Sequence, residues 1–257
     1  MRNVVLSALL VLTVVSAGCS KRPGEVSGSM LFKAVAENDL ASFQSALKDA
    51  PQLVKAENDN GIPVLHFAAG LGRLDMVKLL LESGVDVNST GGFGDVKAIQ
   101  WMFQCKEPRL AVLALLLEEG ADPNTADGFG STALMSAARL GRKDLVELLV
   151  SKGADVNARE TGSLKLSVLH YAVLGANPDV VEYLIGHGAD TAAKDKHDRT
   201  PLDFALAIVA ARGAAHDTGV AMNIDSFVDR AKLEEAAASG KDFNPVIELL
   251  RSHTAAP

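Results

Sequence analysis

The sequence predicts an all-α repeat protein, a solenoid of about six helix-turn-helix repeats with protruding loops. Four segments end alike, and they read LLLESGVDVN, LLLEEGADPN, LLVSKGADVN and YLIGHGAD. Their glycines recur at steps of 36, 33 and 35 residues, at Gly84, Gly120, Gly153 and Gly188. Apolar residues inside these segments recur at helical spacing. A constant period near 33 residues is typical of repeat architectures, in which each unit stacks on the next.

The beginning of the chain predicts a signal peptide over residues 1–18. Arg2 supplies a positive charge, and residues 4–15 form an apolar run of 12 residues. This run is too short to cross about 30 Å of hydrocarbon as a helix. It ends in Ser16-Ala17-Gly18-Cys19, which resembles the lipobox of bacterial lipoproteins, although Ser16 stands where Leu is more usual. The resemblance implies that Cys19 is lipidated, and ordinary cleavage nearby is the alternative.

Residues 19–29 are expected to form the lipidated Cys and a flexible tether, because they contain little apolar surface to bury. Ser20 and Lys21 follow the Cys. By resemblance to lipoproteins that lack Asp there, they imply sorting to the outer membrane. We therefore expect a lipid-anchored protein on the periplasmic face of a Gram-negative outer membrane, with a soluble periplasmic protein as the alternative.

The repeated unit carries a second recurring string at the start of its first helix. The copies read VLHFAA at 64–69, ALMSAA at 133–138, VLHYA at 168–172 and TPLD at 200–203. Together with the period, they resemble the ankyrin repeat, whose signature is Thr-Pro-Leu-His-x-Ala. The resemblance implies a helix-turn-helix with a protruding loop, over an ankyrin-repeat domain at residues 30–257.

One copy shows the physical basis of the prediction. Leu145, Val146, Leu148 and Leu149 recur at helical spacing, so we expect Leu148 to pack between repeats. Gly153 follows where a helix end needs a residue that tolerates positive φ. Thr132 can cap the first helix by accepting a backbone N–H. Ala137 and Ala138 are small enough for helices to approach closely.

The predicted repeats cover residues 30–57, 58–88, 89–124, 125–157, 158–190 and 191–253. The first lacks the recurring strings and is interpreted as a polar cap. The third has Lys97-Ala98-Ile99-Gln100-Trp101 in place of the first string. The sixth is split by an insertion at 213–243, for which the spacing predicts an amphipathic helix over about 225–238. This insertion is interpreted either as a packing elaboration or as a partner-binding or gating element.

Composition and motifs argue against catalysis and cofactor binding. The net charge of −7 disfavours nucleic acid and anionic membrane surfaces as partners. The sequence has neither a phosphate-binding loop with Lys nor a zinc-binding His-Glu-x-x-His or nucleophile elbow. We therefore expect no enzyme activity, no catalytic residue, no metal, no cofactor and no small-molecule substrate. Cys105 is the one remaining thiol once Cys19 is lipidated, and it is interpreted as a small buried residue, with a redox role as the alternative.

Function is expected to lie on the surface. The ankyrin resemblance implies that His66 and His170 are structural and tie neighbouring loops together. It also implies a concave binding face made of loop tips and exposed positions of the first helices. Carried over to this sequence, that face comprises Asp59, Asn60, Ile62, Leu71, Phe93, Phe129, Ser131, Arg139, Leu140, Leu164, Leu166, Leu174, Lys196, His197 and Arg199.

Phe93, Phe129 and Leu164 share one phase of the repeat, just before a first helix, and predict a row of apolar tips. The alternative is that these side chains fold back on neighbouring loops. The leading hypothesis is a module that binds an unidentified protein noncovalently through its concave face. The alternative is an immunity protein, or inhibitor, that neutralises a secreted toxin or an envelope-acting enzyme.

Overall fold

A computed structural model describes residues 28–92, 96–104, 108–214, 236 and 238–254. The chain divides after Gly128 into two compact units. The signal peptide at 1–18, Cys19, Phe93, Cys105 and most of the predicted inserted helix lie outside the described residues.

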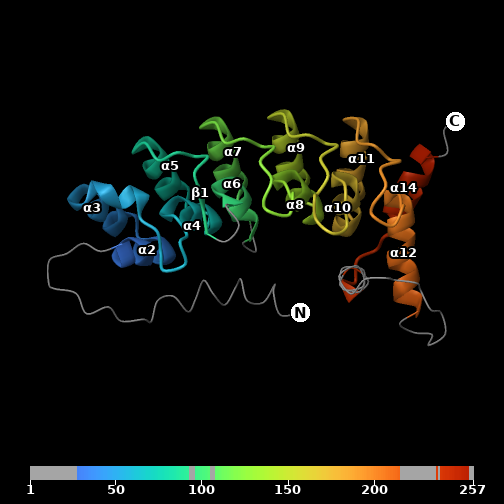
Figure 1. Cartoon of the computed structure of the whole chain (residues 1–257), viewed down its shortest axis with the longest axis horizontal. Helices are drawn as coiled ribbons and strands as arrows, with labels where there is room; N and C mark the ends of the chain where they lie inside the picture. Colours follow the sequence, from blue (N-terminus) through green and yellow to red (C-terminus); the bar gives the residue numbers. More distant parts are fainter. Residues whose placement is uncertain (1–27, 93–95, 105–107, 215–235, 237, 255–257) are drawn as a thin grey trace. The chain divides into compact units, whose positions relative to one another are not determined.

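The first unit consists of helix pairs in chain order. Its helices are α2 (Gly28–Glu37), α3 (Leu40–Asp49), α4 (Val64–Gly70), α5 (Leu74–Glu82), α6 (Ala98–Trp101) and α7 (Leu110–Glu118). Short 3₁₀ turns, η1 (Pro51–Lys55) and η2 (Met102–Gln104), follow α3 and α6. Strands β1 (Thr90–Gly91) and β2 (Val96–Lys97) pair antiparallel, with Thr90 opposite Lys97. In Figure 1, α3, α5 and α7 form one row and α2, α4 and α6 form the other.

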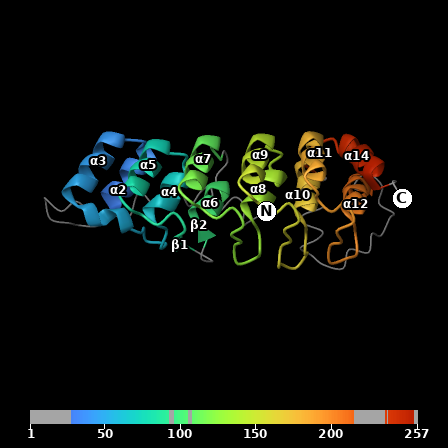
Figure 2. The ribbon, with the colours of Figure 1, turned by 90° about the horizontal axis from the view of Figure 1, so that it is seen from above.

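The second unit repeats this arrangement. Its helices are α8 (Ala133–Arg139), α9 (Lys143–Ser151), α10 (Val168–Gly175), α11 (Pro178–Gly186), α12 (Pro201–Ala214) and α14 (Asn244–Thr254). The first helices α8, α10 and α12 pack in sequence, and α14 contacts both α11 and α12. Figure 2 shows that the loops of this unit project on the side away from the second helices. The predicted all-α repeat fold is therefore correct.

The local signals in the sequence act as expected. Gly84, Gly120, Gly153 and Gly188 all have φ between 82° and 88°, the left-handed conformation that ends the second helices α5, α7, α9 and α11. Thr132 accepts a hydrogen bond from the backbone N–H of Met135 at 3.4 Å and caps α8. These contacts explain where α8 begins and where α5, α7, α9 and α11 end.

Neighbouring repeats are joined by asparagine side chains in the loops that follow the second helices. In the second unit, the Asn157 amide donates to the Gly188 carbonyl at 2.9 Å, and the Asp190 N–H donates to the Asn157 side-chain oxygen at 2.8 Å. In the first unit, Asn88 makes the same two bonds, with Gly120 at 2.9 Å and Asp122 at 3.1 Å. One side chain thus satisfies polar backbone groups of the following repeat.

Two details of the predicted architecture are wrong, and one predicted repeat has an unusually short first helix. Helix α2 begins at Gly28, so the expected tether at 19–29 ends two residues too late. The first helix of the third repeat is reduced to the four residues of α6 followed by a 3₁₀ turn. Leu148 is half-buried, whereas Leu145, Val146 and Leu149 are fully buried in α9. The helical spacing places Leu148 at the margin of the apolar face rather than at its centre.

Candidate partner-binding surface

Phe129 is an exposed aromatic side chain on a loop whose backbone is held in place. The residue is 72% exposed, which agrees with its prediction as an apolar loop tip. Its carbonyl accepts hydrogen bonds from the N–H groups of Thr161 and Gly162, both at 3.0 Å. Gly130 follows with a φ of +77°, and a Cβ there would lie 2.3 Å from the Thr161 nitrogen. The loop of the fourth repeat is therefore tied to the loop of the fifth beneath an outward-facing ring.

The expectation that Leu164 and Leu166 are exposed is wrong. Leu164 is 1% exposed and Leu166 is fully buried. The loop closes on itself, because the Glu160 N–H donates to the Leu166 carbonyl at 3.0 Å. The Leu164 carbonyl in turn accepts from the Lys196 N–H of the next loop at 2.9 Å. Both leucines are therefore turned inward, and for Leu164 the alternative of a side chain that folds back is correct.

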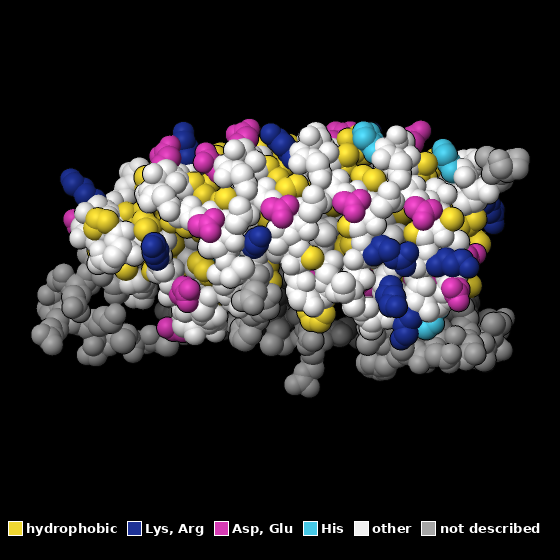
Figure 3. Space-filling model, turned by 45° about the horizontal axis from the view of Figure 1, so that its top comes forward, with side chains coloured by type: hydrophobic (Ala, Val, Ile, Leu, Met, Phe, Trp, Pro, Cys, Tyr) yellow, Lys and Arg dark blue, Asp and Glu magenta, His cyan; other side chains and the backbone are white. Residues whose placement is uncertain are grey.

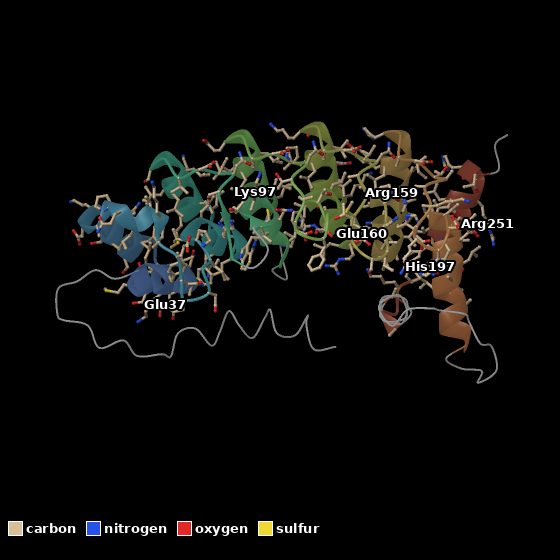
Figure 4. All side chains as sticks on the ribbon, viewed as in Figure 1. Glu37, Lys97, Arg159, Glu160, His197 and Arg251 are labelled. Carbon is tan, nitrogen blue, oxygen red and sulfur yellow. The ribbon has the colours of Figure 1, made fainter. Side chains whose placement is uncertain are left out.

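Beneath that loop lies a buried polar pair that the sequence pattern did not reveal. The Tyr171 hydroxyl donates to the Glu160 carboxylate at 2.5 Å, and both residues are buried. Burial, and then the hydrogen bond to Glu160, raise the pKa of Tyr171, with Ser131 acting against this shift. Figure 4 shows Glu160 within the second unit. The hydrogen bond joins the start of the fifth loop to helix α10, and the Tyr171 hydroxyl stays protonated.

Two exposed residues end helix α8, and a lysine distant in sequence lies close to them. Arg139 and Leu140 are exposed, as predicted, while Ser131 and Leu174 are half-buried. The Lys241 ammonium donates to the carbonyls of Leu174 and Gly175 at 3.1 and 3.0 Å, at the end of α10. Burial, and then the charge of Arg139, lower the pKa of Lys241. The end of the insertion therefore returns to the predicted face at Lys241, which no local pattern signalled.

Arg199 supports its own loop instead of pointing into solvent. Its side chain is 19% exposed and forms an ion pair with Asp195 at 2.7 Å. Its guanidinium also lies 5.3 Å from the Phe204 ring centroid. Burial opposes ionisation of Asp195, but hydrogen bonds from Arg199 and from the His197 backbone keep its pKa below the ordinary value. Among the neighbouring predicted residues, Lys196 is exposed and His197 is half-buried.

In the first unit the predicted face is only partly exposed. Asp59 is exposed, and Asn60 and Leu71 are half-buried. Ile62 is buried, so its prediction as a surface residue is wrong. Its N–H donates to the Asn58 side chain at 3.0 Å, which closes the loop and turns the isoleucine inward. A Cβ on Gly92 would touch the Ile62 side chain at 3.4 Å, so the next loop covers it.

The two signature histidines join neighbouring loops, as the resemblance implied. Nε2 of His66 lies 2.9 Å from the Val96 carbonyl, and Nε2 of His170 lies 3.1 Å from the Arg199 carbonyl. The His170 Nδ1 also contacts the Ser167 hydroxyl at 2.8 Å. Burial lowers the pKa of both imidazoles, although their backbone bonds act in the opposite direction. Both rings are therefore neutral structural groups near neutral pH.

Neither metal-ligand clusters nor membrane-spanning helices are found in the described ranges. No group of three His, Cys, Asp or Glu side chains in them is arranged to hold a metal ion. Among the helices of those same ranges, none is both long and apolar enough to cross a bilayer.

Repeated helix pairs, asparagine bridges and loop ties define, within each unit, an all-α repeat solenoid. The repeats are ankyrin repeats: residues 60–91 match the ankyrin-repeat model, and residues 101–195 match a model of three ankyrin-repeat copies. Ankyrin repeats are modules of protein–protein interaction, so this class implies a protein partner.

Several known proteins are similar to parts of this chain. An ankyrin repeat protein of Acanthamoeba polyphaga mimivirus is 40% identical over 76 residues, 28% of this chain and 10% of that protein. Human Ankyrin repeat and SOCS box protein 6 is 40% identical over 76 residues, 29% of this chain and 18% of that protein. Neurogenic locus notch homolog protein 1 of Xenopus tropicalis is 28% identical over 196 residues, 74% of this chain and 7% of that protein. The matches thus span less than a fifth of each of these relatives.

Proposed function

We propose that this protein is a lipid-anchored ankyrin-repeat module on the periplasmic face of a Gram-negative outer membrane. It binds another protein noncovalently through its loop tips and first helices, and it is not an enzyme. The anchoring part of the proposal is supported by Ser16-Ala17-Gly18-Cys19 after an apolar run. The binding part is supported by the ankyrin repeats at 60–91 and 101–195.

The observation that carries the binding proposal is the exposure of Phe129. An aromatic residue that is 72% exposed gains more from burial in a partner than a polar tip would. Its carbonyl is already held by Thr161 and Gly162, so little backbone freedom is lost on binding. Arg139 and Leu140 are exposed in the same unit and extend the surface with one charge and one apolar side chain.

Affinity capture from a cell envelope tests the binding site. The intact protein is compared with Phe129→Ala and with Leu110→Ala, which removes a 39% exposed leucine from the second helix α7. We expect wild type and Leu110→Ala to recover the same protein and Phe129→Ala to lose it while keeping wild-type circular dichroism. Equal recovery by all three proteins would refute the loop-tip site.

Labelling with radioactive palmitate tests the anchor separately. Wild type should incorporate the label and sediment with the outer membrane, and Cys19→Ala should do neither. Unlabelled wild-type protein in the soluble periplasmic fraction would refute the lipid anchor without bearing on the proposed binding site.

The alternative function is that of an immunity protein or inhibitor that neutralises a secreted toxin or an envelope-acting enzyme. The net charge of −7 favours this alternative for a basic target, because opposite charges speed association. Identification of the captured protein decides between the two functions. A basic hydrolase whose activity falls on binding would support the inhibitor, and a captured protein without such activity would exclude it.

A further inference from the structure

Four exposed cationic side chains gather on two adjacent loops of the second unit. Arg159 and Lys165 lie on the loop of the fifth repeat, and Lys194 and Lys196 lie on the loop of the sixth. We call these four residues the basic loop patch. Figure 3 shows a group of Lys and Arg side chains toward the right of the molecule, and Figure 4 labels Arg159 there. The concentration of positive charge is unusual in a chain with a net charge of −7.

The backbone under the patch is held in place by the patch itself. Nη2 of Arg159 donates to the Lys165 carbonyl at 3.1 Å and also to the Lys194 carbonyl. The Lys196 N–H donates to the Leu164 carbonyl at 2.9 Å, and Lys165 itself has a φ of +53°. The two loops therefore present their lysines from a preorganised backbone, which lowers the entropic cost of binding.

Two of the carboxylates on these loops are buried and bonded to other side chains. Glu160 is buried against the Tyr171 hydroxyl, and Asp195 is buried in its ion pair with Arg199. Asp198 is exposed on the sixth loop, so one carboxylate faces solvent there beside the four cations. As far as the described ranges go, none of the four patch side chains forms an ion pair.

Lysines elsewhere on the surface differ in this respect. Lys33, Lys78 and Lys143 each have a glutamate four residues further on, at 3.9, 3.8 and 3.8 Å. Their charge is locally balanced along one helix face. The patch thus keeps a net positive charge that the helix lysines lack.

We propose that the basic loop patch binds a short acidic segment of the protein partner, with carboxylates of Asp or Glu facing Arg159, Lys165, Lys194 and Lys196. The inference rests on the proposed function, since it names the chemistry of the partner at the loop tips. A short segment fits because the patch covers two loops. A long nucleic acid or an anionic bilayer extends beyond them and meets the acidic remainder of the chain.

Fluorescence anisotropy with a labelled oligoglutamate peptide tests the patch on the full chain. The matching oligoglutamine peptide, a single-stranded oligonucleotide and phosphatidylglycerol vesicles serve as the other probes. We expect binding of oligoglutamate that weakens with added salt and exceeds binding of the other three probes. The triple variant Lys165→Ala, Lys194→Ala, Lys196→Ala should bind about tenfold more weakly or worse.

A matched variant separates the patch from net charge. Lys33→Ala, Lys78→Ala, Lys143→Ala removes the same charge from helix positions and should bind oligoglutamate as wild type does. Equal weakening of both triple variants, absence of oligoglutamate binding, or tighter binding of oligonucleotide or vesicles would each overturn the proposal. In the envelope capture, a partner lost by Phe129→Ala but fully retained by the patch variant would overturn the acidic-segment inference alone.

Discussion

Replacing Gly175 with Ala should destabilise the second unit, because Gly175 allows α8 and α10 to approach closely. A Cβ at this position would lie 2.3 Å from the Ala138 carbonyl oxygen, 3.2 Å from the Gly141 nitrogen and 3.3 Å from the Arg139 oxygen. Ordinary contacts of a Cβ begin at 3.4 Å, so the helices would have to separate by about 1 Å. Because the obstructing atoms belong to the backbone, no side-chain rotation relieves the overlap.

The expected cost is about 1 to 3 kcal/mol, the usual range for overpacking. The higher helix propensity of Ala offsets about 0.5 to 1 kcal/mol of it. Gly186 provides the matched control, since it ends α11 as Gly175 ends α10 and a Cβ there would meet nothing within 4 Å. Gly186→Ala should therefore leave stability unchanged or raise it by up to about 1 kcal/mol.

Equilibrium urea unfolding followed by circular dichroism measures both variants against wild type. The midpoint should fall for Gly175→Ala and stay the same or rise for Gly186→Ala, with unchanged slopes. If Gly175→Ala were as stable as Gly186→Ala, the close approach of α8 and α10 would be refuted.

Two further predictions concern the core and the signature histidines. Leu149→Ala should lower the free energy of unfolding by about 2 to 5 kcal/mol because Leu149 is fully buried. Leu148→Ala should lower it clearly less because Leu148 is half-buried. Equal losses in urea titrations would contradict the packing of α9. Burial lowers the pKa of His66 and His170 below 6.5 in the folded chain, so the unfolded chain takes up protons first as the pH falls. Their contribution to stability should be fully present above pH 6.5 and be lost as the pH falls from there through the lowered folded values. Urea midpoints measured across this window should decline, and the decline should be smaller in a His66→Gln, His170→Gln variant; midpoints that rise on acidification would show that the imidazoles charge more easily in the folded state.

The repeat period is informative about helices because both depend on short-range spacing. Leu145, Val146 and Leu149 recur as one helix face must, and they are buried together in α9. Gly153 ends that helix with a φ of +88° because a residue with a side chain is strained there. Such features involve residues a few positions apart, and the sequence displays them directly.

Loop residues were harder to predict because their neighbours come from other repeats. Phe129 and Leu164 share one phase of the repeat, yet Phe129 is exposed and Leu164 is buried. The difference follows from the tie of Leu164 to Lys196, more than thirty residues away. Arg199 likewise resembles a surface cation in the sequence until its ion pair with Asp195 and its contact with Phe204 are seen.

The sequence by itself determined the class of fold, the phase of the helices and the positions of their glycine ends, because these depend on spacing within one repeat. The tertiary structure decided which loop side chains reach solvent, which is set by contacts across repeats. It brought Lys241 to the end of α10, 66 residues from Gly175 in the chain. It also paired Glu160 with Tyr171 and Asp195 with Arg199 inside the fold. Four cations on the same loops remain exposed, namely Arg159, Lys165, Lys194 and Lys196. The burial of loop side chains and the charge balance of the surface depend on that packing, and the repeat pattern does not encode them.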